Sequence, residues 1–427
     1  MKTRLFSLFL LLVLSSTPGL AQLKKDSPES VGVSSQALDK IDEHIKQYMA
    51  ESKVPGGSFL VAKEGKIIYQ KHFGYHNSKN ERAYEAGDIF RIASMTKAIT
   101  CVSIMQLYEQ GKIALDDPVY KYIPAFKDQV VLDTFDPADS SFTTVPVEKP
   151  VTIRNLLTHT SGIVYPSFNP GKLMAVYEKF NMNVGFSHPT WTTEEWINKL
   201  AKVPLAHQPG KKFSYGLSMD VLGRIIEVVS GEKLNVYFAK NIFEKAGLVD
   251  THFYLPEEKF DRLAPVYTVV EDKLITIDEL GMAAQASYPK EGPRDIFAGG
   301  AGLSSTLMDY ALFIQELVQG GGKLLGKEAL AEMTRDQMPD VITDYQPNPR
   351  QTDGSFALGF TVYQDKPNKR SPKSPGTYEW GGYFNTKFFI DPQEQLIFVG
   401  MTQVVPFNYN DFWEDMYKLI YASIQDH

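Results

Sequence analysis

The sequence contains little cysteine: Cys101 is the only one in 427 residues. A single cysteine excludes an internal disulfide, even in an oxidising compartment. Because Cys101 lies in an apolar stretch, we expect it to be a small buried core residue.

Dense clusters of lysine and arginine are also absent, and the formal net charge is −7. Both features argue against nucleic acid as a partner. The sequence has no His-Glu-x-x-His motif and no cysteine and histidine cluster of the metal-binding type, so we expect no metal and no cofactor. It also lacks a Gly-x-Ser-x-Gly motif, which argues against the triad of an α/β-hydrolase.

The apolar run Leu5–Leu14 is too short to span a membrane. It follows Lys2 and Arg4 and precedes Gly19–Ala21, which is the pattern of a signal peptide. No cysteine follows the run, which argues against a lipoprotein anchor. We therefore expect residues 1–21 to be cleaved near Ala21 and the mature protein to be periplasmic or secreted, without a membrane span.

Strand patterns lie at the two ends of the chain, and helix patterns dominate its middle. Near the N-terminus we expect a helix from Ser34 or Ser35 to about Glu51 and strands at Ser58–Ala62 and Lys66–Phe73. Toward the C-terminus we expect four strands and a closing helix, at Phe356–Tyr363, Thr377–Trp380, Thr386–Ile390, Leu396–Thr402 and Asp411–Ile424. These elements predict an α/β domain, with one antiparallel sheet built from both chain ends and packed by the terminal helices, beside an all-α lobe.

The predicted α/β domain comprises residues 22–120 and 295–427, and the mainly helical lobe is an insert of residues 121–294. Helical patterns in the lobe cover Thr152–Thr158, Gly171–Phe180, Thr192–Ala201, Ser218–Val229 and Val236–Ala246. Val130–Val147 is predicted to be a loop or a small hairpin.

The stretch Phe90–Leu107 contains Ser94 and Lys97, three residues apart and therefore on one face of a helix. A serine hydroxyl is a poor nucleophile until a base removes its proton, and a neutral lysine amine can be that base. Burial and a helix N-terminus both favour the neutral amine over the ammonium. The pattern alone leaves two interpretations open with equal weight: an activated nucleophile or an ordinary helix-capping serine.

The same Ser-x-x-Lys spacing recurs at Ser230 and Ser287. Gly231 predicts that a helix ends just after Ser230, and Pro289 would disrupt a helical turn that began at Ser287. Only Ser94 precedes a long apolar helix, which we expect to end at Gly111.

Two further stretches suit the same chemistry. Tyr215 lies beside Gly216, just before a predicted helix, so that its hydroxyl can project into a cleft and relay protons beside a lysine. Trp380 precedes Gly381 and Gly382, and a glycine pair in a strand marks close approach of another backbone or a ligand. Such a strand edge can supply a backbone N–H to an oxyanion hole.

Three motifs follow one another along the chain: Ser-Met-Thr-Lys at Ser94–Lys97, Tyr-Gly-Leu at Tyr215–Leu217 and Trp-Gly-Gly at Trp380–Gly382. In this order they resemble the motifs of the serine β-lactamase and penicillin-binding-protein superfamily. Within it, the chain is most similar to class C β-lactamase-like esterases and acyltransferases, over most of the mature chain. Further matches to superfamily signatures are Leu156–Gly162, Gln208–Gly210, Asp220–Gly223, Gly300–Ser304 and Ile390–Pro392. The motifs are specific for the superfamily and much less so for the substrate.

This resemblance implies a role for each motif residue. Ser94 would be the acylated nucleophile and Lys97 the base that activates it. Tyr215 would pass the proton to the leaving group and later help to activate water. The oxyanion hole would be formed by the backbone N–H groups of Ser94 and Tyr383. No equivalent of the deacylating glutamate of class A β-lactamases is visible, which fits the class C-like similarity.

The chain departs from the β-lactamases of the superfamily at two positions. Leu217 stands where they usually carry asparagine, and Trp380–Gly382 stand where they carry Lys-Thr-Gly. The lysine and asparagine help to hold the carboxylate and amide of a β-lactam, whereas leucine and tryptophan suit a neutral ester. We therefore expect Leu217, Trp380, Gly381 and Gly382 to contact the substrate.

Other polar and aromatic residues have simpler interpretations. We expect His159 to be a hydrogen-bonded loop anchor rather than a base, and Asp220 to be a first-turn or packing carboxylate. Tyr165, Phe168 and Tyr288 either line a cleft or pack in the core, and the sequence leaves both alternatives open.

The leading hypothesis is an exported serine hydrolase that cleaves a small-molecule carboxylic ester through an acyl-enzyme on Ser94. The runner-up is a D-amino-acid peptidase or weak β-lactamase that acts on an amide at the same site. A third hypothesis is a catalytically silent binding protein, against which the intact Ser94, Lys97 and Tyr215 argue. The sequence leaves open the substrate, the oligomeric state, and the choice between hydrolysis and acyl transfer.

Overall fold

The computed structural model describes residues 23–77, 81–168, 171–182, 191–281, 287–291, 294–338, 354–365 and 371–425. The predicted signal peptide, residues 1–21, lies outside these ranges. Among the helices in the described ranges, none has the length and apolar character needed to cross a membrane.

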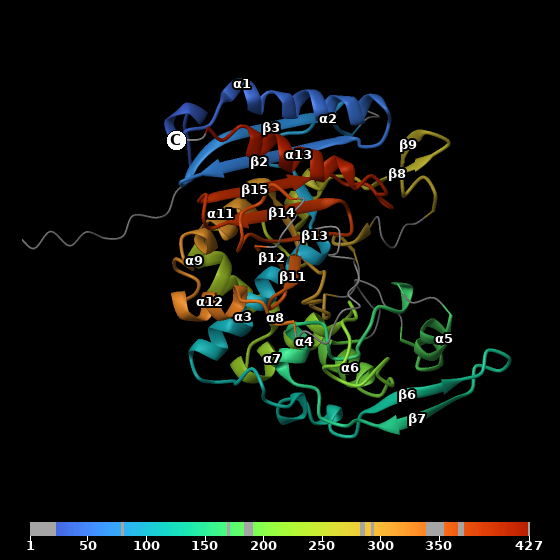
Figure 1. Ribbon diagram of the computed structural model, residues 1–427. Coiled ribbons are helices and arrows are strands. Elements are labelled where there is room, and N and C mark those ends of the chain that lie inside the picture. The colour runs from blue at the N-terminus through green and yellow to red at the C-terminus, as the bar shows by residue number, and fades with distance from the viewer. Residues whose placement is uncertain are drawn as a thin grey trace, which may run out of the picture.

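Within the described residues, a nine-stranded sheet is built from both ends of the chain (Figure 1). The strands follow the order β1-β3-β2-β15-β14-β13-β12-β11, with β4 paired to β3. They are β1 (Lys24–Lys25), β2 (Gly56–Lys63), β3 (Lys66–Asn77), β4 (Arg82–Ala83), β11 (Gly354–Phe356), β12 (Thr361–Tyr363), β13 (Tyr378–Gly382), β14 (Thr386–Asp391) and β15 (Leu396–Met401). The antiparallel pairing of β2 with β15, which sets Ser58 opposite Met401, confirms the predicted union of the two chain ends.

Helices cover both faces of this sheet, which explains why β2 and β15 are buried along their whole length. On one face lie α1 (Ser35–Leu38), α2 (Lys40–Ala50) and α13 (Asp411–Ala422), whose apolar residues share one cluster with Phe59 and Phe398. On the other face lies α11 (Leu307–Val318), in the cluster that contains Leu60 and Ile397. The prediction that the terminal helices pack on the sheet is therefore confirmed.

Most of the remaining elements form the lobe drawn below the sheet in Figure 1 or join this lobe to the sheet, whereas the hairpin of residues 267–276 is drawn beside the sheet at the upper right. The helices are α3 (Thr96–Glu109), α4 (Ile153–Leu157), α5 (Lys172–Lys179), α6 (Thr193–Leu200), α7 (Ser218–Ser230), α8 (Leu234–Phe238), α9 (Glu244–Ala246) and α12 (Lys327–Thr334). The short strands are β5 (Ile89–Arg91) paired with β10 (Ser304–Thr306), β6 (Val130–Phe135) with β7 (Phe142–Pro146), and β8 (Tyr267–Val270) with β9 (Lys273–Thr276).

Helix α3 is buried from Thr96 to Leu107, which accounts for a sequence too apolar for an exposed helix. Its residues share one core cluster with those of α7 and α11, so α3 is packed between the lobe and the sheet. Cys101 is buried there, as expected, and burial raises the pKa of its thiol.

Two predicted elements differ in the structure, and a third adopts one of its two predicted alternatives. Phe356–Tyr363 is not one strand but two, β11 and β12, because Gly359 turns the chain with φ of 85°. Gly359 also packs closely against α3, since a Cβ at this position would lie 2.2 Å from Cys101 Sγ. Val236–Ala246 contains a π-helical turn, Ala239–Phe243, between α8 and α9. Val130–Val147 forms a hairpin, the second of its two predicted alternatives.

A buried ion pair joins strand β13 to the segment before it. Lys373 and Glu379 are paired, and Tyr363 Oη accepts from Lys373 Nζ at 3.1 Å and donates to Glu379 Oε1 at 3.1 Å. Lys373 is 2% exposed and Glu379 is 8% exposed, so each charge depends on the other.

We expect Glu379→Gln to lower the free energy of unfolding by about 3 kcal/mol, because it removes the carboxylate that is paired with the buried Lys373 ammonium. Urea unfolding monitored by tryptophan fluorescence measures the change. The double variant Lys373→Met/Glu379→Gln should recover most of the loss, and equal losses in the single and double variants would contradict a paired role.

Candidate active site

Ser94 lies in a 3₁₀ turn, Ala93–Met95, that leads directly into α3. The residue before it, Ala93, has φ of 41°, a left-handed conformation that costs energy in a residue other than glycine. Ser94 does not cap α3: the N-cap is Met95, without a side-chain cap bond. Of the two interpretations of Ser94, the geometry therefore favours the activated nucleophile over the helix-capping serine.

The hydroxyl of Ser94 contacts two proton-carrying side chains. Lys97 Nζ lies 3.0 Å from Ser94 Oγ, and the hydroxyl of Tyr215 donates to the same oxygen at 2.7 Å. The structure thus brings together the three predicted catalytic residues, which come from two segments 121 residues apart in sequence.

Lys97 is completely buried, and within the described ranges no carboxylate pairs with it. Its Nζ instead contacts three uncharged oxygens: Gly300 O at 2.6 Å, Ser94 Oγ at 3.0 Å and Tyr165 Oη at 3.4 Å. An ammonium has three N–H donors, which match these three acceptors. In the neutral amine, Gly300 and Tyr165 can take the two N–H groups, and the lone pair then faces Ser94.

Tyr215 is held by close backbone packing. Its carbonyl accepts the N–H of Tyr165 at 3.2 Å. The next residue, Gly216, leaves no room for a side chain, because a Cβ would lie 2.2 Å from Ile163 O. Trp380 Nε1 donates to Tyr215 Oη at 3.4 Å, so the strand β13 also orients the phenol.

The glycine pair of β13 approaches the turn that carries Ser94. A Cβ on Gly382 would lie 2.3 Å from Ile92 O, so only glycine allows β13 to come this close. The close backbone approach predicted from the glycine pair is therefore present. Tyr383 follows at the end of the strand and lines the same cavity as Ser94, and the oxyanion role of their backbone N–H groups stays a prediction.

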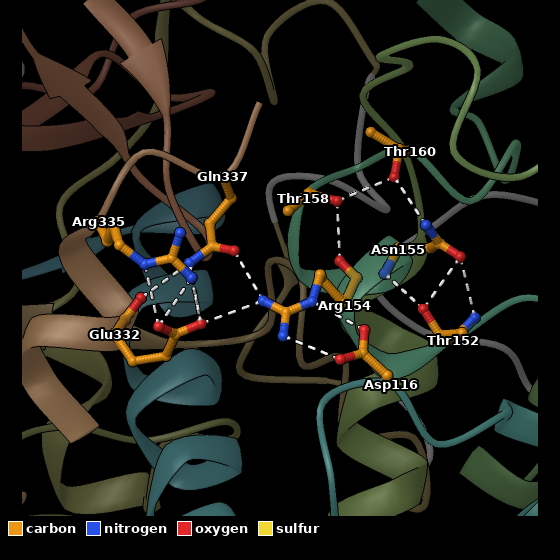
Figure 2. A network of polar contacts seen from close by, with 9 residues as sticks. All are labelled: Asp116, Thr152, Arg154, Asn155, Thr158, Thr160, Glu332, Arg335 and Gln337. Atoms are coloured by element: carbon orange, nitrogen blue, oxygen red, sulfur yellow. Dashed lines mark hydrogen bonds and ion pairs between the residues drawn. The ribbon is translucent and has the colours of Figure 1, made fainter. Parts of the chain in front are cut away.

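The loop after α4 is fixed by a polar network (Figure 2). Arg154 Nη1 on α4 reaches Glu332 on α12 at 3.1 Å. Asn155 Nδ2 donates to Thr160 Oγ1 at 3.1 Å, which closes the loop around His159. The network anchors α4 to α12 and thereby fixes this loop.

His159 is buried, and neither of its ring nitrogens has a hydrogen-bond partner in the described part of the chain. Burial, with a contribution from the Lys97 charge, holds the pKa of His159 well below its usual range. Its ring packs against Tyr215 at 4.8 Å between centroids. His159 was expected to anchor its loop through hydrogen bonds of the ring, and this expectation is not met. The neutral ring packs behind Tyr215 instead. The loop is held by the backbone oxygen of His159, which accepts Ser214 N–H at 2.8 Å.

A cavity of about 950 Å³ opens over Ser94 and Tyr215. Of the predicted substrate-contacting residues, Trp380, Gly381 and Gly382 line this cavity. Leu217 does not, because it is 2% exposed at the start of α7 and packs in the main core. The sequence alone could not show which of these apolar residues lines the cavity and which packs in the core, since both environments favour large apolar side chains.

Two aromatic residues at the cavity were left undecided by the sequence. Phe168 lines it and is 58% exposed, and its ring stacks on that of Tyr215 at 6.2 Å between centroids. Tyr165 contacts Lys97 Nζ, whereas Tyr288 is buried away from the cavity.

Across the described residues, no group of three or more histidine, cysteine or acidic side chains could hold a metal ion.

The family model for β-lactamase matches residues 41–419 of the chain. Esterase EstB from Burkholderia gladioli is 26% identical over 82% of this chain and 86% of its own length. Acyltransferase calJ from Penicillium decumbens is 29% identical over 80% of this chain and 82% of its own length. The solved structure of EstCE1, a hydrolase with promiscuous acyltransferase activity, superposes with a TM-score of 0.75 at 26% identity, over 90% of this chain and 99% of that one.

We expect Gly382→Ala to slow covalent labelling of Ser94 by a fluorophosphonate about 100-fold, because the added Cβ would push β13 away from the Ser94 turn. Labelling is followed by intact-protein mass spectrometry. Gly381→Ala is the matched control, since its Cβ would meet chiefly the flexible Lys387 side chain, at 2.8 Å from Cδ. Equal losses in the two variants would contradict a role for this close approach.

Proposed function

The chain belongs to the β-lactamase family, and on that premise we propose that it hydrolyses a small-molecule carboxylic ester through an acyl-enzyme on Ser94. The observation that carries the proposal is the double contact at Ser94 Oγ, with Lys97 Nζ at 3.0 Å and Tyr215 Oη at 2.7 Å. Similarity to proteins named as an esterase and an acyltransferase supports the same reaction class.

In the acylation step, neutral Lys97 takes the proton of the Ser94 hydroxyl as Oγ forms a bond to the ester carbonyl carbon. The carbonyl electron pair moves onto oxygen, and the backbone N–H groups of Ser94 and Tyr383 stabilise the resulting oxyanion. When the tetrahedral intermediate collapses, the bond to the alcohol oxygen breaks and Tyr215 gives that oxygen its proton. Lys97, now an ammonium, restores the proton of Tyr215.

In the deacylation step, a water molecule attacks the acyl carbon, Tyr215 passes its own proton to neutral Lys97, and Tyr215 takes the proton of the water. The acyl–Ser94 bond then breaks, and the Lys97 ammonium gives its extra proton to the Ser94 oxygen. The packing of Tyr215 against Trp380 and His159 supports this role, because it holds the phenol beside Ser94 throughout both steps.

A neutral substrate suits the walls nearest Ser94. Trp380, Phe168 and Tyr383 are aromatic, and Phe168 and Tyr383 are about half exposed at the cavity. Binding is stabilised when a substrate covers apolar surface of this kind.

Acyl transfer to a second alcohol is the alternative outcome, and it is favoured by a cavity that continues from Ser94 to Lys418 on α13.

The purified mature protein should hydrolyse a short-chain p-nitrophenyl ester much faster than a chromogenic cephalosporin. Ser94→Ala should reduce ester turnover about 1000-fold or more, and Lys97→Met should have a comparable effect, because the two residues act as one unit. Absorbance assays give the rates, and thermal unfolding shows that the variants remain folded.

An unchanged ester rate in Ser94→Ala would refute the mechanism. Faster turnover of the cephalosporin or of a D-Ala-D-Ala peptide would favour the peptidase or β-lactamase alternative. An added primary alcohol that captures the acyl group as a new ester would identify acyl transfer as the activity. Absence of any label on Ser94 would instead favour a silent binding protein.

We also propose that the protein is exported and that residues 1–21 are removed. Lys2 and Arg4, the apolar run Leu5–Leu14 and the small residues before Gln22 support this proposal. Protein expressed in a bacterial host should be recovered from the periplasm or medium with Gln22 as its first residue, as measured by mass spectrometry of the N-terminal peptide. Recovery of the uncleaved chain from the cytoplasm would contradict it.

A further inference from the structure

Two consecutive glycines join the helix that carries Lys97 to helix α7. Gly299 O accepts a hydrogen bond from Thr100 Oγ1 at 2.7 Å, and Gly300 O accepts one from Lys97 Nζ at 2.6 Å. From the opposite side, the N–H of Gly300 donates to Asp220 Oδ1 at 2.9 Å. Three hydrogen bonds therefore hold this loop between α3 and α7.

The glycines fit this space because they have no side chain. A Cβ on Gly300 would lie 2.7 Å from Asp220 Oδ2, and a Cβ on Gly299 would lie 2.6 Å from Met219 O. The position of the carbonyl that binds Lys97 is thus set by direct packing against Asp220.

Asp220 is unusual for a packing residue. It is 1% exposed, and its Oδ2 has no hydrogen-bond partner among the described residues. Burial raises its pKa to about 6, although the Lys97 charge and the Gly300 N–H act in the opposite direction. A buried carboxylate oxygen without a partner destabilises the fold, so an uncharged residue would serve packing better.

We propose that Asp220 is a positioning residue for acylation: it holds Gly300 so that Lys97 is aligned with Ser94. The proposal rests on the serine chemistry described above. Asp220 does not touch the Ser94 hydroxyl and acts only through Gly300.

The alignment follows from the donors of a neutral amine. One N–H of Lys97 must bind Gly300 O and the other Tyr165 Oη if the lone pair is to face Ser94. Without the bond from Gly300 to Asp220, the loop can shift and the lone pair can turn away. A displacement of about 1 Å at a reacting group can slow a reaction about 100-fold.

The test measures the rate of fluorophosphonate labelling at Ser94 at one fixed pH for wild type, Asp220→Asn and Asp220→Ala. Asp220→Asn keeps an oxygen acceptor for Gly300, so its rate should stay within about 3-fold of wild type. Asp220→Ala loses the acceptor, and its rate should fall about 100-fold. With a p-nitrophenyl ester, the loss should appear in kcat rather than in KM.

Asp309→Asn is the matched control, because Asp309 is also a buried carboxylate in the first turn of a helix and accepts from Asp250 N–H and Thr251 Oγ1, away from Ser94. Its labelling rate should not change. A loss in Asp220→Asn as large as the one expected for Asp220→Ala would overturn the proposal even if Asp220→Ala does not fold, as would a wild-type rate in Asp220→Ala. Failure of wild type itself to label would refute the proposed function.

Discussion

The constraint on which the site depends is a lysine amine that is buried and that forms no ion pair with any carboxylate of the described residues. Lys97 has no exposed surface, and around it the described structure offers a carbonyl and two hydroxyls rather than a paired carboxylate. A buried ammonium that lacks a partner is destabilised far more than a neutral amine. Uncharged acceptors therefore keep Lys97 hydrogen-bonded in both protonation states, and they do not fix it as an ammonium. The carboxylate of Asp220 stands one residue further away, beyond Gly300.

The rest of the molecule brings three separate segments to this amine. The turn Ala93–Met95 supplies Ser94, helix α3 supplies Lys97, the lobe supplies Tyr215, and the sheet supplies the edge of β13. Each approach depends on a glycine whose Cβ would collide with a backbone or carboxylate atom: Gly216, Gly300 and Gly382. Because backbone and short side chains pack directly there, the site has few rotatable bonds that could disorder it, which is the condition for preorganised catalysis.

Much of this arrangement could be predicted from sequence because it depends on local patterns. The strands at both chain ends alternate or run apolar as sheet residues do, and the glycine pair after Trp380 predicts the close approach that Gly382 makes to Ile92. The contacts of Lys97 could not be predicted in the same way. Its carbonyl partner, Gly300, lies 203 residues away, and Tyr165 lies 68 residues away. Gly300 opens a stretch that matches a superfamily signature, but its distance along the chain does not show that its carbonyl binds Lys97, and Tyr165 belongs to none of the motifs.

Leu217 shows why a motif position does not settle the direction of a side chain. It follows Tyr215 by two residues, and the turn at Gly216 directs it into the core. Under the proposed function, discrimination between an ester and a β-lactam therefore falls mainly to Trp380, which lines the cavity and also donates to Tyr215 Oη at 3.4 Å. One side chain thus shapes the substrate wall and orients the phenol that moves the proton. Selectivity and rate are linked through Trp380, so a change of substrate class at this position also changes the catalytic geometry.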